Sequence, residues 1–160
     1  MSYIQQSLGD GETIIARAHF HVLYTIAAWL SLLIPGALLV VSLGNAQSQP
    51  DPYTAAAGLL FVLGLFTFLR MMIRKWSIEI GVTSHRFVEK YGLLSMRTNE
   101  IALPNIEGVK VNQSILGRIF GYGTVKIEGT GVDSVMTPPI ADPVGFVRAI
   151  QTAKEHVAAR

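Results

Sequence analysis

A long stretch of sequence without charge constrains this protein more than any other feature. Residues 22–69 carry one formal charge, Asp51, although they are 48 of the 160 residues. Over the whole chain 15% of residues are charged and half are hydrophobic, whereas a globular protein has about 25% charged residues. This distribution excludes a wholly soluble fold. It also excludes a disordered chain, because disorder requires low hydrophobicity and high charge.

The first apolar run, residues 22–43, is predicted to be a membrane span. It has no charged residue, and its Leu, Ile and Val side chains are distributed all round a helix. A bilayer core about 30 Å thick is crossed by about 20 helical residues. A buried helix of a soluble core would need a larger domain, and the run is longer than the apolar core of a cleaved signal peptide. Pro35 and Gly36 lie in the middle, where we expect a kink.

A second span is predicted at residues 53–73, after a polar turn rich in proline at residues 45–52. Its last part includes Arg70, whose guanidinium can reach the membrane surface along its aliphatic stem. Two spans joined by a short turn form a helical hairpin. Gly58 and Gly64 are small enough to let the two helices approach closely, although they are six residues apart rather than four.

The positive charges predict the orientation of this hairpin. Arg17 precedes the first span, and Arg70, Arg74 and Lys75 end the second, whereas the turn between the spans has no Lys or Arg. Positively charged flanks stay in the cytoplasm, so we expect both termini there. The expected organisation is a cytoplasmic segment at residues 1–21, the hairpin at 22–73 and a cytoplasmic domain at 76–160.

The C-terminal part changes to a strand-like pattern. Hydrophobic residues alternate with polar ones in short segments bounded by Gly, Pro or Asn, which is typical of an antiparallel sandwich or partly open barrel. The expected strands are residues 77–82, 86–91, 99–103, 108–111, 124–128 and 132–136. Residues 114–120 are expected to form a short helical or irregular connection. A last helix is predicted after Asp142 as N-cap, with Pro143 at its first position. The expected fold class is therefore α+β with membrane helices: a hairpin, then a β domain capped by a helix, in the outline of a pleckstrin-homology (PH) fold.

The same part of the chain resembles a known family. The segment QSILGRIFGYGTV occupies residues 113–125, with VTSHR at 82–86 before it and IADP at 140–143 after it. Glu100 to Leu103, followed by Ile106 and Val109, completes the pattern. These blocks are similar to the bacterial PH domain family of the YdbS type, over about half the chain from Trp76 to roughly Ile150. The resemblance implies a PH-like fold in the bacterial inner membrane, behind a pair of spans, and it brings no catalytic residues.

Residues that carry chemistry are sparse. The sequence has no Ser-His-Asp set, no paired acids in a predicted cleft and no dinucleotide fingerprint, so we expect a protein that is not an enzyme and has no cofactor. His19 and His21 are two residues apart, with no cysteine or nearby acid to complete a metal site, and we expect none. A net charge of +2 without a basic stripe gives no indication of nucleic-acid binding.

Three functions stay open at this point. The first is a PH-like domain that binds a protein partner or assembles with its own copies at the bilayer. The second is contact with anionic lipid headgroups, for which the candidate residues are Arg70, Arg74, Lys75, His85 and Arg86. The last two lie in the predicted first β-turn, which offers one arginine and a histidine rather than several cations. The third, a pore of assembled hairpins, has no charge at either span centre to favour it.

Overall fold

The computed structural model describes residues 3–45, 52–92, 95–130 and 132–158. The chain forms two compact units, one made of Met1–His21 together with Trp76–Arg160 and the other of Val22–Lys75. The first unit therefore combines sequence from both sides of the apolar stretch. This differs from the expected organisation, in which residues 1–21 stood apart from the C-terminal domain.

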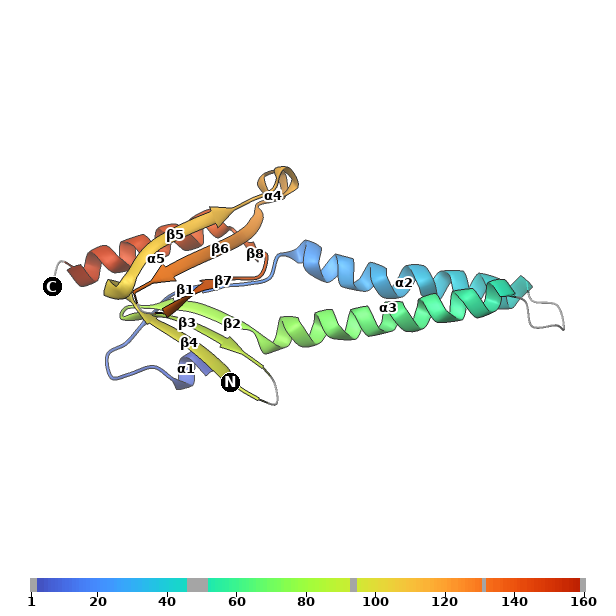
Figure 1. The fold of residues 1–160 in the computed structure, drawn as a ribbon, viewed down its shortest axis with the longest axis horizontal. Helices are drawn as coiled ribbons and strands as arrows, with labels where there is room; N and C mark the ends of the chain where they lie inside the picture. Colours follow the sequence, from blue (N-terminus) through green and yellow to red (C-terminus); the bar gives the residue numbers. More distant parts are fainter. Residues whose placement is uncertain (1–2, 46–51, 93–94, 131, 159–160) are drawn as a thin grey trace. The chain divides into compact units, whose positions relative to one another are not determined.

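The second unit is the helical hairpin of α2 (Val22–Asn45) and α3 (Pro52–Ser77) (Figure 1). The last two residues of α3, Trp76 and Ser77, belong to the first unit. By length and composition both helices are able to cross a membrane. Helix α2 continues through Pro35, which lies inside it. Of the turn expected at residues 45–52, Asn45 ends α2 and Pro52 begins α3, and residues 46–51 lie outside the described residues.

One glycine lets the two helices pack closely. A Cβ atom on Gly64 would overlap the backbone carbonyl oxygen of Ser31 and lie 3.0 Å from Cγ of Pro35. A Cβ on Gly58 would meet nothing within 4 Å. The sequence indicated both glycines as candidates for close approach, and in the structure Gly64 alone of the two has this role.

The first unit begins with α1 (Tyr3–Gln6) and β1 (Ile14–Ala18), neither of which was expected from the sequence. Strand β1 opens an antiparallel sheet in the order β1-β2-β3-β4, with β2 at Glu79–Thr83, β3 at Arg86–Tyr91 and β4 at Arg97–Ala102. In the register of β1 and β2, Arg17 faces Gly81 and Ala18 faces Ile80. The helical hairpin is thus inserted between two strands that are neighbours in one sheet.

A second antiparallel sheet follows the short 3₁₀ helix η1 (Leu103–Asn105). It is ordered β5-β6-β7, with β5 at Ile106–Asn112, β6 at Tyr122–Gly129 and β7 at Val132–Met136. Helix α4 (Ile115–Phe120) connects β5 to β6, where a short connection was expected, and β8 (Ile140–Ala141) pairs with β6. The strands predicted from Arg86 onward are all present, so the alternating pattern identified them correctly. Strands β3 and β7 have the predicted ends, and the ends of β4, β5 and β6 are shifted.

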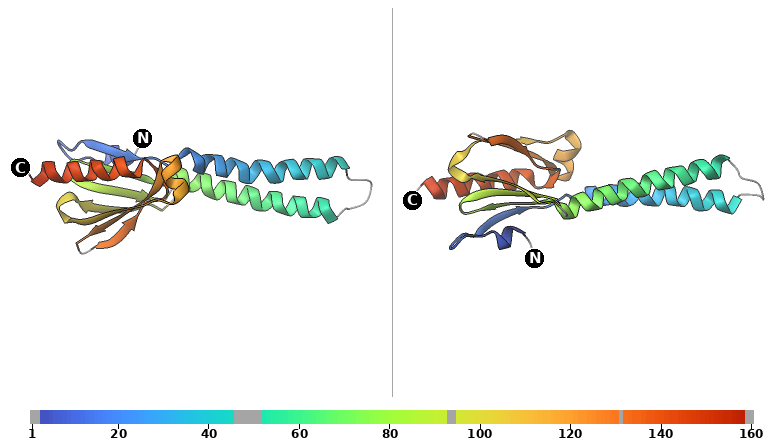
Figure 2. Two further views of the ribbon diagram at one scale, coloured as in Figure 1. Left: turned by 90° about the horizontal axis from the view of Figure 1, so that it is seen from above. Right: turned by 60° about the horizontal axis from the view of Figure 1, so that its bottom comes forward.

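Helix α5 (Pro143–Ala158) completes the unit and begins at Pro143, as predicted. The backbone N–H of Gly145 donates to Oδ1 of Asp142 at 2.9 Å, which satisfies one of the free N–H groups of the first turn. The helix contacts β1 and β2 of one sheet and β5 and β6 of the other, and Figure 2 shows it alongside both. Its Phe146 and Ile150 join a core with Phe87 and Val125. The α+β fold class, with two apolar helices before unclosed antiparallel sheets and a last helix, is confirmed.

Candidate functional site

The turn between β2 and β3 holds two of the residues expected to contact lipid. Thr83 shapes this turn, because its Oγ1 accepts hydrogen bonds from the backbone N–H of His85 at 3.3 Å and of Arg86 at 3.0 Å. A threonine that binds the backbone two and three residues ahead stabilises a tight turn. His85 is exposed, and its Nδ1 lies 2.9 Å from Oγ of Ser84.

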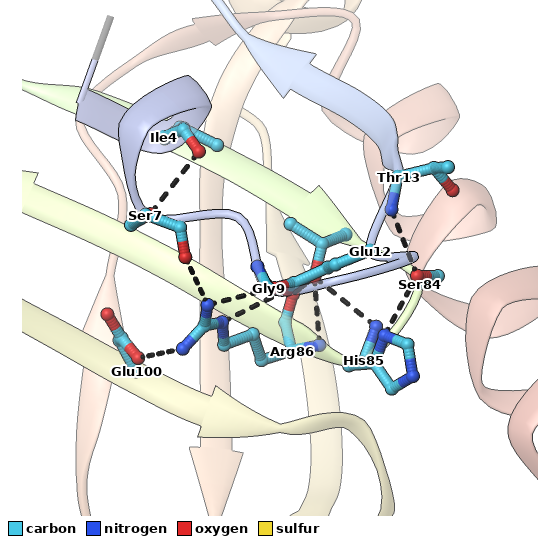
Figure 3. Close-up of polar contacts among 10 residues, drawn as sticks. Ile4, Ser7, Gly9, Glu12, Thr13, Ser84, His85, Arg86 and Glu100 are labelled. Carbon is cyan, nitrogen blue, oxygen red and sulfur yellow. Dashed lines mark hydrogen bonds and ion pairs between the residues drawn. The ribbon is translucent and has the colours of Figure 1, made fainter.

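Arg86 is engaged by groups of its own domain (Figure 3). Its Nε donates to Oε1 of Glu12 at 3.0 Å and its Nη2 to Oε2 at 2.9 Å, a bidentate pair. Nη1 donates to Oε2 of Glu100 at 2.8 Å, and Nη2 also donates to the backbone oxygen of Ser7 at 2.6 Å. Each nitrogen of the guanidinium therefore has an acceptor within the domain.

The electrostatics of this cluster favour the ion pair. Burial by itself would raise the pKa of Glu12, but hydrogen bonds from the Gly9 N–H, the Thr83 hydroxyl and Arg86, with the positive charge of Arg86, lower the pKa to about 2. The hydrogen bond to Glu12 raises the pKa of Arg86, with burial opposing it. The side chain of Glu12 is only 5% exposed, so its charge depends on these partners.

Sequence reasoning identified Arg86 but missed its partners Glu12 and Ser7. These residues precede Arg86 by more than 70 positions, and the sequence of both long helices lies between them and Arg86. The sequence indicated only weakly that this segment joins the domain, because the strand of residues 14–18 is five residues long and comes shortly before the charge-free run. The structure thus brings Arg86 to an internal contact rather than to an open cationic surface.

The other three predicted lipid-contact residues lie at the C-terminal end of α3, in or next to its last turns. Lys75 Nζ donates to Oγ1 of Thr25 in α2 at 2.7 Å, which links the two helices. Arg70 and Arg74 are exposed and one helical turn apart. Both line a groove of about 310 Å³ between α2 and α3, together with Tyr24 and Phe66.

A second carboxylate, Glu89 on β3, is fully buried. Burial raises its pKa, while hydrogen bonds from the Tyr91 hydroxyl and from Nδ2 of Asn99, at 3.3 Å, act in the opposite direction. A buried carboxylate with a raised pKa is a feature of many active sites. Among the described residues, however, there is no group of three or more His, Cys, Asp or Glu side chains that could hold a metal ion. Its contacts are those of a structural polar cluster in the sheet.

Comparison with known families agrees with this architecture. A family model described as "Bacterial PH domain" matches residues 22–154. The chain belongs to the bacterial PH domain family. The match covers both apolar helices as well as the β domain, and it begins after β1. Neither the curated proteins nor the solved structures that were searched gave a significant match. The PH domain of this chain also includes residues 1–21, which supply its first strand.

Proposed function

We propose that this bacterial PH domain protein is a non-enzymatic component of the inner membrane that presents its PH domain to a protein partner or to a second copy of itself. The hairpin crosses the bilayer, and both termini lie in the cytoplasm. The positive charges Arg17, Arg74 and Lys75 near the domain, with no Lys or Arg between the spans, support this orientation.

The engagement of Arg86 is the observation that carries the proposal. A PH domain that binds a phosphorylated headgroup at the β2–β3 turn needs cations there that are free to meet phosphate oxygens. The turn offers Arg86 and His85, and Arg86 already binds Glu12, Glu100 and the Ser7 carbonyl. To bind phosphate, it would have to leave Glu12 partly buried without its partner, which is costly. The scaffold is therefore better suited to contacts with protein.

Strand β4 supplies a place for such a contact. Within the described part of the chain it pairs with β3 alone and forms one edge of the first sheet. Its residues Arg97, Thr98, Asn99 and Glu100 are all exposed. An edge strand presents unpaired backbone N–H and C=O groups, to which an extended segment of another chain can add.

Photo-crosslinking in native membranes tests this function. A photoreactive amino acid replaces Thr98 on β4, and the control carries it at Thr152, an exposed residue of α5. We expect a crosslinked species of defined mass from Thr98 and none from Thr152. Only monomer at both positions, together with no protein that co-purifies with the full-length chain, would contradict the proposal.

Anionic lipid binding is a second candidate function, favoured by the groove at the end of α3. Arg70 and Arg74 lie on one face of α3, and Phe66 and Thr67 from the preceding turn line the same groove. A basic surface beside apolar side chains at the end of a span suits an acidic phospholipid. Native mass spectrometry with phosphatidylglycerol should show less bound lipid for R70Q/R74Q than for the control R148Q on α5. Equal binding would exclude this site.

A further inference from the structure

Helix α4 is short, and hydrogen bonds and close packing hold it in place at the end of the β5–β6 hairpin. Oγ of Ser114 accepts from the backbone N–H of Gly117 at 3.0 Å, and Gly121 ends the helix in the left-handed conformation with φ of 73°. Gly117 is buried, and a Cβ there would come within 2.6 Å of the Tyr122 carbonyl oxygen. The side chain of Gln113 also donates to this oxygen at 3.1 Å. The helix is thus a fixed projection of the sheet.

This projection exposes large apolar side chains. Ile115 is 81% exposed, Leu116 58%, Ile119 70% and Phe120 52%. The domain core behaves differently, since Phe87, Val125, Ile127 and Ile150 are completely buried. Four of the six residues of α4 therefore present apolar surface, and the remaining exposed one, Arg118, is basic. Exposed apolar surface of this density marks an interaction site.

The projection lies beside the point where the chain leaves the domain for the first span. Tyr122 follows α4 after Gly121, and its ring centroid is 5.4 Å from that of His21. His21 is the last residue of this unit before α2 begins at Val22. The backbone around it is also fixed, because the N–H of Ala141 donates to the carbonyl oxygen of His19 at 2.9 Å.

We propose that α4 inserts its apolar side chains into the interfacial region of the bilayer and holds the PH domain down on the membrane surface. The inference uses the membrane anchoring of the proposed function but does not depend on a protein partner. An interfacial helix buries its apolar face about 5–10 Å into the boundary between headgroups and acyl chains. Arg118 then lies at headgroup level, where its charge suits anionic lipid, and α4 has no acidic residue to oppose this. Because α2 follows His21 directly in the chain, this connection keeps α4 near the bilayer without a separate binding step.

Spin-label accessibility in the full-length protein tests the insertion. The chain has no cysteine, so single cysteines report on one position each. The variant I119C and the control N105C are labelled and placed in nanodiscs of phosphatidylethanolamine and phosphatidylglycerol. Asn105 precedes β5, seven residues and roughly 20 Å of extended strand away from the end that carries α4. We expect the label at position 119 to be accessible to oxygen and shielded from a water-soluble nickel reagent, and the label at 105 to behave in the opposite way.

Two outcomes would overturn the proposal. Access of the nickel reagent to both labels would place α4 in water, and shielding of position 119 from both reagents would show that protein, not lipid, covers the helix.

A second variant tests whether the apolar side chains cause the insertion. A label at L116C should become accessible to nickel when I115S and I119S are added. A label that stays in lipid after these changes would contradict an active role of the apolar side chains. Because Ile115 and Ile119 are exposed, these substitutions leave the domain core intact.

Discussion

Nη2 of Arg86 lies 2.9 Å from Oε2 of Glu12, an ion pair that joins the two parts of the chain on either side of the helical hairpin. The same connection is made by the backbone, since β1 pairs with β2. The hairpin of α2 and α3 is therefore a long insertion between two adjacent antiparallel strands. The PH domain of this protein is completed by residues that precede the hairpin.

The ion pair should contribute measurably to stability. We expect E12Q to lower the free energy of unfolding by about 2 kcal/mol at neutral pH, because it removes the bidentate carboxylate partner of a partly buried guanidinium. The matched control is E100Q, which removes the more exposed partner and should cost less than about 1 kcal/mol. Thermal unfolding of the full-length protein in detergent gives both values. Equal effects of the two substitutions would be inconsistent with a special role of Glu12.

Acid should remove this contribution. The pKa of Glu12 is lowered to about 2 in the folded state from 4.5 in the unfolded chain. A lowered carboxylate pKa stabilises the fold at pH above the unfolded value, and the benefit is lost as the pH falls from 4.5 towards 2. The stability difference between the wild type and E12Q should therefore shrink over this range. A difference that stays constant down to pH 2 would show that Glu12 does not act through its charge.

The stability contribution of Glu89 should have the opposite pH dependence. Burial raises its pKa in the folded state, so its contribution to stability is complete below the unfolded value and declines as the pH rises through the folded one. We expect E89Q to be more stable than the wild type at pH 8, on the order of 1 kcal/mol, because Gln needs no buried charge. The gain should disappear near pH 4. Melting curves at the two pH values measure it, and a loss of stability at pH 8 would contradict the prediction.

The packing of the hairpin should depend on one glycine. We expect G64A to destabilise the helix pair by about 2 kcal/mol, because the new methyl group meets the Ser31 backbone. The control G58A adds the same atom where nothing lies within 4 Å and should be close to neutral. Unfolding of the two variants in the same detergent compares them. A G64A protein as stable as G58A would show that the helices do not approach as described.

The PH domain should need β1 in order to fold when it is produced without the hairpin. Residues 76–160 alone lack β1 and Glu12, so we expect them to aggregate or to lack a cooperative unfolding transition. Residues 1–21 joined to 76–160 by a short Gly-Ser linker should fold, because Ala18 and Ile80 are already paired neighbours. Circular dichroism and thermal melting distinguish the two proteins. Cooperative unfolding of residues 76–160 alone would show that β1 is dispensable.

The periodic patterns were the reliable part of the sequence. The alternation in residues 86–91 predicted β3 with its observed ends, and Asp142-Pro143 predicted the start of α5, because turn and capping chemistry is local. The sequence also predicted both apolar helices from length and charge. It missed α1 and β1, since Ile14–Ala18 is a short segment whose partner lies more than 60 residues further along the chain.

Arg86 shows what the sequence could not predict about the candidate functional site. Its position in the predicted first β-turn was evident from the sequence, and it was one of five candidate residues for contact with anionic lipid headgroups. The partners that engage it come from residues 7–12 and from β4, and only the folding of both chain segments onto one sheet brings them together.

Sequence patterns alone identified the two helices able to span a membrane, the family and the strand-rich domain that follows, because hydrophobic length and periodicity are properties of neighbouring residues. Only the three-dimensional fold shows that residues before α2 complete the PH domain, that Glu12 pairs with Arg86, and that Gly64 is the close contact of the hairpin. It also decided that the apolar side chains of α4 are exposed while those of the neighbouring strands form the core. These outcomes depend on which distant surfaces meet, which no local pattern specifies.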